Sequence, residues 1–245
     1  MNSEKILQYI RQHCNADDWA LYISYWDSHE TRFAQNGITQ HIAGPKLDIT
    51  LNVSYGTKSG SATVNQDDEN TLAFMLKTAQ DIAAHAPEDP EFMPSAEKAD
   101  LPEVNNCDPE TKNLEPIQMV DIVQKTIDKA KAFGASVSGM TEKHYHNSWM
   151  FTKNGFAGNS ERTNFGHSMT IKKAEVETKV DYEAKNFGGF DLDRDFAQLQ
   201  AQAEALADLH VFEPQKIAVI MRPSALLELM WFMGWMMNRR QSDEG

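Results

Sequence analysis

Two heptapeptides of the sequence carry an Asn-Gly pair at the same position: Arg32-Phe33-Ala34-Gln35-Asn36-Gly37-Ile38 and Met150-Phe151-Thr152-Lys153-Asn154-Gly155-Phe156. Asparagine and glycine both tolerate positive φ, so Asn-Gly favours a type I′ turn between two antiparallel strands. Each heptapeptide therefore predicts a β-hairpin. Their surroundings predict that the hairpins lie at corresponding places in two similar halves of the chain.

The same order of helical and strand-like segments surrounds both turns. Before the first turn come a helix and two strand-like runs, Glu4–His13, Trp19–Trp26 and Glu30–Gln35. After it come Ile38–Ile42, Leu47–Tyr55, Lys58–Val64 and a helix from Asp67–Asp68. The second half repeats this order with Gln118–Phe133, Ala135–Thr141, Trp149–Lys153, Phe156–Glu161, His167–Ala174, Glu175–Ala184 and a helix from Asp193. Period-2 runs indicate strands and 3.6-period runs indicate helices.

The predicted fold is α+β: two similar α/β repeat units with mainly antiparallel curved sheets and flanking helices, plus the start of a third region. We expect the first unit at residues 1–86 and the second at 117–213. Residues 87–116 hold six of the nine prolines and many acids, which predicts an extended connector. In 214–245 we expect a strand, Lys216–Met221, and an apolar helix, Pro223–Asn238, that begin a truncated C-terminal domain.

Composition and charge narrow the class of protein. The 245 residues carry a net charge of −13, which argues against a nucleic-acid groove because phosphate binding needs clustered Lys and Arg. Cys14 and Cys107 are far apart and form no redox or metal motif. The start of the chain lacks an apolar signal core, and Arg222, Pro223 and Glu228 interrupt the most apolar run. We therefore expect a cytoplasmic protein with no membrane span.

Taken together, these features resemble the TldD/PmbA family, whose members are labelled peptidases or modulators of DNA gyrase. The resemblance depends on the heptapeptide Arg32–Ile38, on the helix that ends in Ala86-Pro87-Glu88-Asp89-Pro90-Glu91-Phe92, and on the strand and helix Lys216–Asn238. It covers the whole chain through the order and spacing of these segments. Family members are roughly twice as long and add a C-terminal β-rich domain.

In the family's peptidase subunit, the helix that follows the strand carries an HExxxH motif. Two such histidines bind Zn²⁺ and the glutamate acts as general base. The corresponding stretch here has no histidine: Glu228, Leu229, Met230, Trp231, Phe232 and Met233. Large apolar side chains cannot ligate zinc. The chain therefore resembles the family's non-metal partner, the TldE (PmbA) type, and we expect no catalytic residue, metal or cofactor in it.

Four other groups of residues are candidate sites. His144 and His146 are spaced to face one side of a strand, with His167 a few strands away, so a shared metal is conceivable. We favour a solvated loop there, because Lys143, Tyr145 and Asn147 are their neighbours. The acids Asp67, Asp68 and Glu69 are expected to cap a helix, and Glu175, Glu177, Asp181 and Glu183 to form the wet face of a strand. The helix at 224–238, rich in Trp and Met, is expected to be core, with a peptide or cofactor groove as the alternative.

The resemblance implies a role in a TldD/E-type metallopeptidase that degrades small unfolded peptides, with zinc only in a TldD-like partner. Partners would be that subunit or a second copy, plus the peptide substrate, with no direct nucleic acid and no membrane. One alternative is an interaction protein that modulates another macromolecule, as the gyrase label suggests. A further alternative is a peptidase that acts alone with metal ligands from elsewhere in the chain.

Overall fold

A computed structural model describes residues 2–207 and 213–244. The chain divides into two compact units, Met1–Asp208 and Leu209–Gly245. The first unit contains α1 (Ser3–His13), β1 (Asp18–Ala34), β2 (Gly37–Tyr55), β3 (Lys58–Val64), α2 (Glu69–His85), α3 (Pro109–Lys112), α4 (Pro116–Phe133), β4 (Ser136–Thr152), β5 (Ala157–Lys173), β6 (Val176–Ala184), a 3-10 turn η1 (Phe187–Gly189) and α5 (Leu192–Leu206). The second contains α6 (Pro223–Met236) and α7 (Arg239–Glu244).

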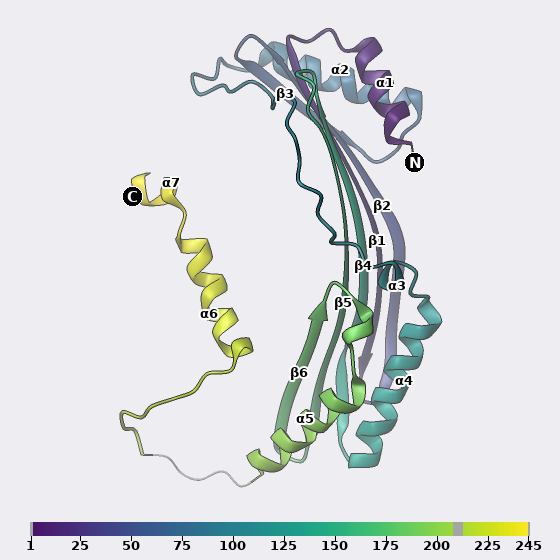
Figure 1. Cartoon of the computed structure of the whole chain (residues 1–245), viewed down its shortest axis with the longest axis vertical. Coiled ribbons are helices and arrows are strands. Elements are labelled where there is room, and N and C mark those ends of the chain that lie inside the picture. The colour runs from purple at the N-terminus through teal and green to yellow at the C-terminus, as the bar shows by residue number, and fades with distance from the viewer. Residues whose placement is uncertain (1, 208–212, 245) are drawn as a thin grey trace. The chain divides into compact units, whose positions relative to one another are not determined.

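The strands form one six-stranded antiparallel sheet in the order β3-β2-β1-β4-β5-β6 (Figure 1). The α+β class and the repeated order of elements are confirmed. The halves were expected to hold a sheet each, but β1 pairs with β4 from Ala20↔Thr152 to Phe33↔Gly139 and joins them. An isolated three-stranded sheet would leave both of these strands with an unpaired edge, and the β1–β4 pairing satisfies those backbone groups.

Several strands are longer than the sequence pattern predicts. The runs on either side of residues 27–29 and of residues 142–148 join into single strands, β1 and β4, each of 17 residues. Lys143, Tyr145 and Asn147 therefore lie within β4, and the expectation of a solvated loop around His144 and His146 was wrong. The sequence suggested a loop because these polar side chains break the apolar alternation. In the strand, each of the three has a hydrogen-bond or ring partner on a neighbouring strand.

Both predicted hairpins are present, but neither turn has left-handed backbone at both Asn and Gly. In the first, Gln35 (φ 50°) and Asn36 (φ 61°) are the left-handed residues, and Gly37 already pairs with Ala34. The Asn36 side chain accepts from Val137 N at 2.8 Å and donates to Ala135 O at 3.1 Å. These bonds hold Asn36 as the second residue of the two-residue turn, where the sequence predicted it as the first. In the second, only Gly155 has positive φ, at 90°.

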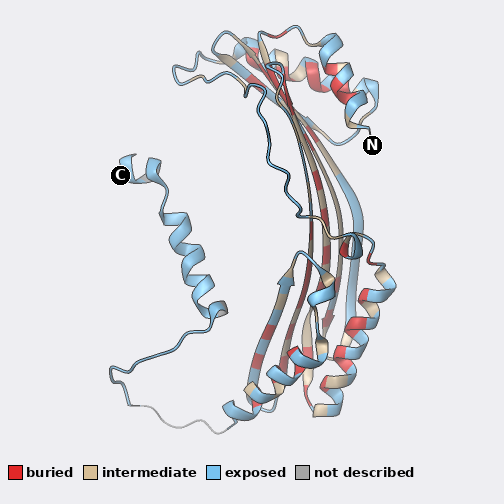
Figure 2. Cartoon of the chain, viewed as in Figure 1, coloured by how far each residue is buried: buried red, intermediate tan, exposed pale blue. Residues whose placement is uncertain are grey.

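One face of the sheet carries all the helices of the first unit. Side chains at alternate positions of a strand share a face, and Leu21, Ile23 and Phe33 of β1 are buried. Leu21 and Ile23 pack with α1 and α2, whereas Phe33 packs with α4 and α5, so two large apolar cores lie on the same face (Figure 2). A third, smaller cluster includes Met119 of α4 and Phe165 of β5. We call the face that carries the helices the covered face and the opposite one, with Trp26 and His146, the open face.

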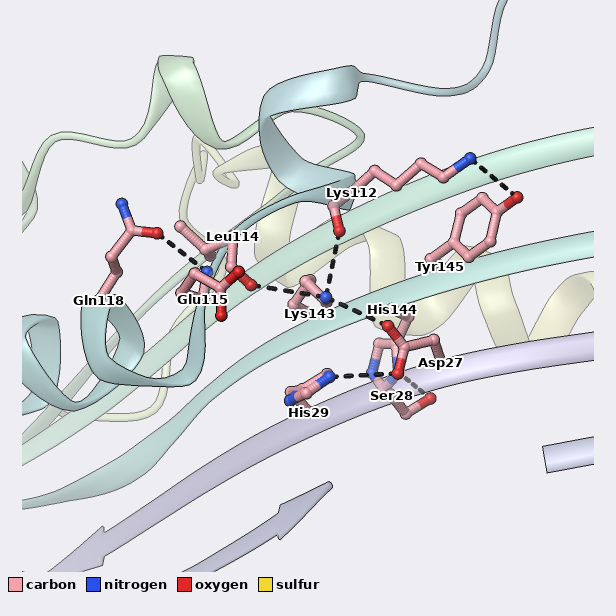
Figure 3. A network of polar contacts seen from close by, with 10 residues as sticks. All are labelled: Asp27, Ser28, His29, Lys112, Leu114, Glu115, Gln118, Lys143, His144 and Tyr145. Atoms are coloured by element: carbon pink, nitrogen blue, oxygen red, sulfur yellow. Dashed lines mark hydrogen bonds and ion pairs between the residues drawn. The ribbon is translucent and has the colours of Figure 1, made fainter. Parts of the chain in front are cut away.

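Between the two cores, the covered face holds polar side chains under α3 (Figure 3). The ammonium group of Lys143, 3% exposed, donates to Lys112 O at 3.2 Å and Leu114 O at 3.5 Å and lies 3.4 Å from Asp27 Oδ2. Asp27 also contacts His29 Nε2 at 3.1 Å. Since a buried ammonium group is costly without partners, these contacts hold α3 against β4.

The connector lies against the sheet over much of its length. Ser95 N and Oγ both donate to the Asp18 carboxylate at 2.6 Å, and Thr152 Oγ1 donates to Ala96 O at 2.7 Å. Asn106 then forms an isolated parallel β-bridge with Arg162 of β5. At this point of β5, β6 no longer pairs with the strand edge. The connector therefore borders the open face at one end and continues into α3 on the covered face.

In the second unit, α6 begins at Pro223, as the sequence predicts. The structure describes Lys216–Met221 without the expected strand, because a strand needs a neighbour to pair with and none of residues 213–244 supplies one. The large side chains of α6 are exposed, Trp231 and Phe232 among them. Among the described residues, no helix combines the length and the apolar character that a bilayer crossing requires.

Candidate functional site

The open face brings polar and aromatic side chains of β1 and β4 into matching rows. The antiparallel register places Ser24 opposite Ser148, Trp26 opposite His146, Ser28 opposite His144 and Glu30 opposite Glu142. The next strand adds Arg162 opposite His146. The predicted His144/His146 pair therefore does face one side of a strand, and it lies at the centre of the sheet.

An aromatic and cationic row crosses the middle of this face. The rings of Trp26 and His146 stack, with centroids 4.0 Å apart and planes 23° apart. The Arg162 guanidinium carbon lies 5.2 Å from the Trp26 ring centroid, within cation–π range. His146 Nε2 and Ser24 Oγ form a 2.9 Å hydrogen bond. Burial, together with the nearby Arg162 charge, lowers the pKa of His146, so the neutral ring is favoured.

An acidic row with one histidine lies beside it. His144 Nε2 is 3.3 Å from Glu142 Oε2, and His144 Nδ1 is 2.9 Å from Ser28 Oγ. The hydrogen bond to Glu142 raises the pKa of His144 against the opposing effect of burial, and the charges of Glu142, Glu30 and Glu183 add to the increase. The two neighbouring histidines thus differ: one is held toward its protonated form and the other toward its neutral form.

Two adjoining hollows follow these rows. One, of about 340 Å³, is lined by Trp26, His144, His146, Arg162, Thr163, Asn164 and Glu183. The other, of about 360 Å³, shares His146 and has a more apolar lining that includes Tyr22, Leu101, Met150 and Phe156. Leu101 belongs to the connector, which therefore forms part of the wall. Apolar rings with a few placed polar groups are typical of ligand-binding surfaces.

His167 does not join the other two histidines. It is 1% exposed on the covered face, where its ring nitrogens bond to Thr141 Oγ1 at 2.7 Å and Thr126 Oγ1 at 3.2 Å. Burial lowers the pKa of His167 to about 4. Within the described residues, the one group of three side chains able to share a metal is Glu30, Glu142 and His144.

The other residues that the sequence suggested as sites lie in a helix cap, along an exposed strand and in α6. Asp68 is the N-cap of α2 and accepts from Thr71 N at 3.1 Å. Glu177, Asp181 and Glu183 lie exposed along β6, with Glu175 in the preceding turn. Residues 228–233, the stretch that the resemblance compares with HExxxH, form part of α6. The absence of a metal or a catalytic residue from this stretch stays a prediction.

Sequence reasoning missed Trp26, Arg162, Glu30 and Glu142 as site residues. Within each strand these residues occupy the positions of one face. Nothing in the sequence, however, shows that β1 pairs with β4. Only the register Trp26↔His146 brings them together.

No protein-family model and no curated protein matches the chain. Solved structures do match it. TldE from Thermococcus kodakarensis has 16% identity and a TM-score of 0.69, over 81% of this chain and 47% of that one.

Two structures that carry the label of a candidate DNA gyrase modulator also match. The protein from Thermotoga maritima has 11% identity and a TM-score of 0.66, over 83% of this chain and 47% of that one. The protein from Bacteroides thetaiotaomicron has 15% identity and a TM-score of 0.63, over 82% and 48%. The chain therefore has the fold of these proteins and spans about half their length.

Proposed function

We propose that this chain is part of a TldE-like subunit that receives extended peptides on its open face, and that a metal-bearing TldD-type partner cuts them. The observation that carries the proposal is the shared fold with TldE over 81% of the chain. The sequence supports the non-metal role, because residues 228–233 contain no histidine. Zinc chemistry would then belong to the partner.

The open face suits an unfolded peptide in its chemistry. Trp26 and Tyr22 offer aromatic surface, and Arg162, Glu183 and Asn164 offer polar partners beside it. Stacking on aromatic rings accepts many side chains, whereas a substrate-specific pocket would be narrow and closed. This combination supports binding of peptides with varied sequences.

A strand edge gives a second way to hold a peptide backbone. β3 pairs with β2 only from Ile49 to Tyr55, so within the described residues the stretch 38–48 of β2 has no strand on its outer side. Ile38 and Ile42 are exposed there, and Pro45 removes one backbone donor from the edge. An extended peptide can add to such an edge by main-chain hydrogen bonds.

The test measures fluorescence polarisation of a labelled, flexible peptide that contains aromatic and basic residues. We expect Trp26→Ala to weaken binding by about tenfold, since an aromatic contact of this kind contributes about 1.4 kcal/mol. Circular dichroism checks that the variant is folded.

The matched control is Phe74→Ala, which removes another aromatic ring, one that is 65% exposed on α2. Its affinity should equal that of the unmodified protein. Equal affinity for Trp26→Ala and the unmodified protein would exclude the open face as the peptide site. Binding to purified gyrase in place of the peptide would favour the interaction-protein alternative.

A further inference from the structure

Glu30, Glu142 and His144 form a cluster on the open face whose geometry the proposed function does not use. Their ligand atoms all lie within 4.8 Å of one another. Glu30 and Glu142 are directly opposite across the β1–β4 pair, and His144 follows on the same side of β4. Each side chain is about a quarter exposed, so solvent and ions can reach the cluster.

The two carboxylates are costly as a pair. Like charges directly opposite on neighbouring strands destabilise a sheet, and a cation between them relieves the repulsion. The nearby cations are His144, when protonated, and Arg32, whose Nη2 lies 3.7 Å from Glu30 Oε2. The Arg32 side chain is 55% exposed, so solvent weakens its attraction to Glu30.

The histidine is held in an orientation that suits a ligand. When Nδ1–H donates to Ser28 Oγ at 2.9 Å, the lone pair of Nε2 points toward Glu142. Metal-binding histidines commonly have their second nitrogen fixed by such a hydrogen bond, which sets the tautomer and the ring direction. Ser28 lies directly opposite His144 in the strand register, so the backbone itself sets this contact.

A glycine on the next strand makes room for the cluster. Gly166 pairs with Glu142, and a Cβ at this position would lie 2.9 Å from both Cγ and Oε1 of Glu142. Any side chain there would push the carboxylate away from β5. The glycine therefore preserves the position that brings Glu142 to His144.

We propose that Glu30, Glu142 and His144 bind a divalent transition-metal ion, with Zn²⁺ as the best match. One imidazole and two carboxylates are a donor set that zinc accepts, and three protein ligands leave a position for water or a bound peptide group. The site departs from the expectation that the chain holds no metal. It uses none of residues 228–233 and does not depend on the proposed peptide role.

The test is calorimetric titration of metal-free protein with Zn²⁺. We expect one ion per chain, and we expect His144→Ala and Glu142→Gln each to weaken binding by about 100-fold. A loss of this size follows because even outer-shell partners contribute 10–100-fold. Ser28→Ala should weaken binding by about tenfold. Zinc should also raise the melting temperature of the unmodified protein, since it binds only the folded form.

His146→Ala is the matched control, because it removes the neighbouring histidine of the same face and leaves the cluster intact. Its zinc affinity should stay within twofold or so of the unmodified protein. The melting temperature of each variant without zinc confirms that it folds. Absence of stoichiometric binding would overturn the proposal, and so would equal zinc affinity in the His144→Ala variant and the unmodified protein.

Discussion

Gly60→Ala is expected to lower the free energy of unfolding by about 3 kcal/mol, at the upper end of the usual cost of overpacking. Gly60 lies on β3 where α2 crosses it, and a Cβ there would overlap Ala79 O and Ala83 N and lie 3.1 Å from Ala83 Cα. All three atoms belong to the helix backbone, so no side-chain rotation can relieve the overlap. The helix must move away from the core that contains Ala79 and Ala83.

Urea denaturation followed by circular dichroism measures this loss, and Gly44→Ala is its control. Gly44 lies on β2 with no atom within 4 Å of the added Cβ. Its substitution should leave stability unchanged or raise it by about 0.5 kcal/mol, because alanine restricts the unfolded chain. Similar stabilities for the two variants would show that α2 does not pack closely on β3.

Acidification from pH 7 to pH 5 is expected to cost the protein about 2 kcal/mol of stability through His167 alone. The pKa of His167 falls from 6.5 to about 4 on folding, because the ring is buried between two threonines. The unfolded chain therefore takes up a proton first as the pH falls. Stability from this residue is complete above about pH 6.5, decreases toward pH 4, and changes no further below it.

The measurement compares unfolding free energies at pH 7 and pH 5 for the unmodified protein and for His167→Gln, which cannot titrate. The pH difference should shrink by about 2 kcal/mol in the variant, whatever its absolute stability. His85→Gln, which alters an exposed histidine in α2, should keep the original difference. An unchanged difference in His167→Gln would show that the native ring takes up its proton as readily as the unfolded one.

Local signals in the sequence predicted α1, α2, α4, α5 and α6, whereas α3, inside the expected connector, and α7 were not predicted. Asp68 caps α2, Gly134 ends α4 with φ 71°, and Pro223 begins α6. Each depends on chemistry within a few residues, so neighbouring sequence contains all the information needed. The hairpins and the α+β class were predictable for the same reason, because turn residues and period-2 runs are also local.

Contacts between distant segments were not predictable. The pairing of β1 with β4 turns two units into one sheet and sets the row Trp26↔His146. It also buries Lys143, which the sequence placed in a loop because its partners Asp27 and Leu114 come from other segments. The cluster of Glu30, Glu142 and His144 depends on the same register. The open-face residues other than the two histidines were therefore missed.

The most direct test of the proposed function mixes the protein with a metal-bearing TldD-type protein and follows cleavage of an unfolded peptide. The account predicts that the two proteins form a complex and that the mixture cleaves the peptide faster than the metal-bearing protein does. A chelator should abolish this cleavage, and our protein should show none by itself. Chelator-sensitive cleavage by our protein without the partner would contradict the account, as would a mixture that forms no complex and leaves the cleavage rate unchanged.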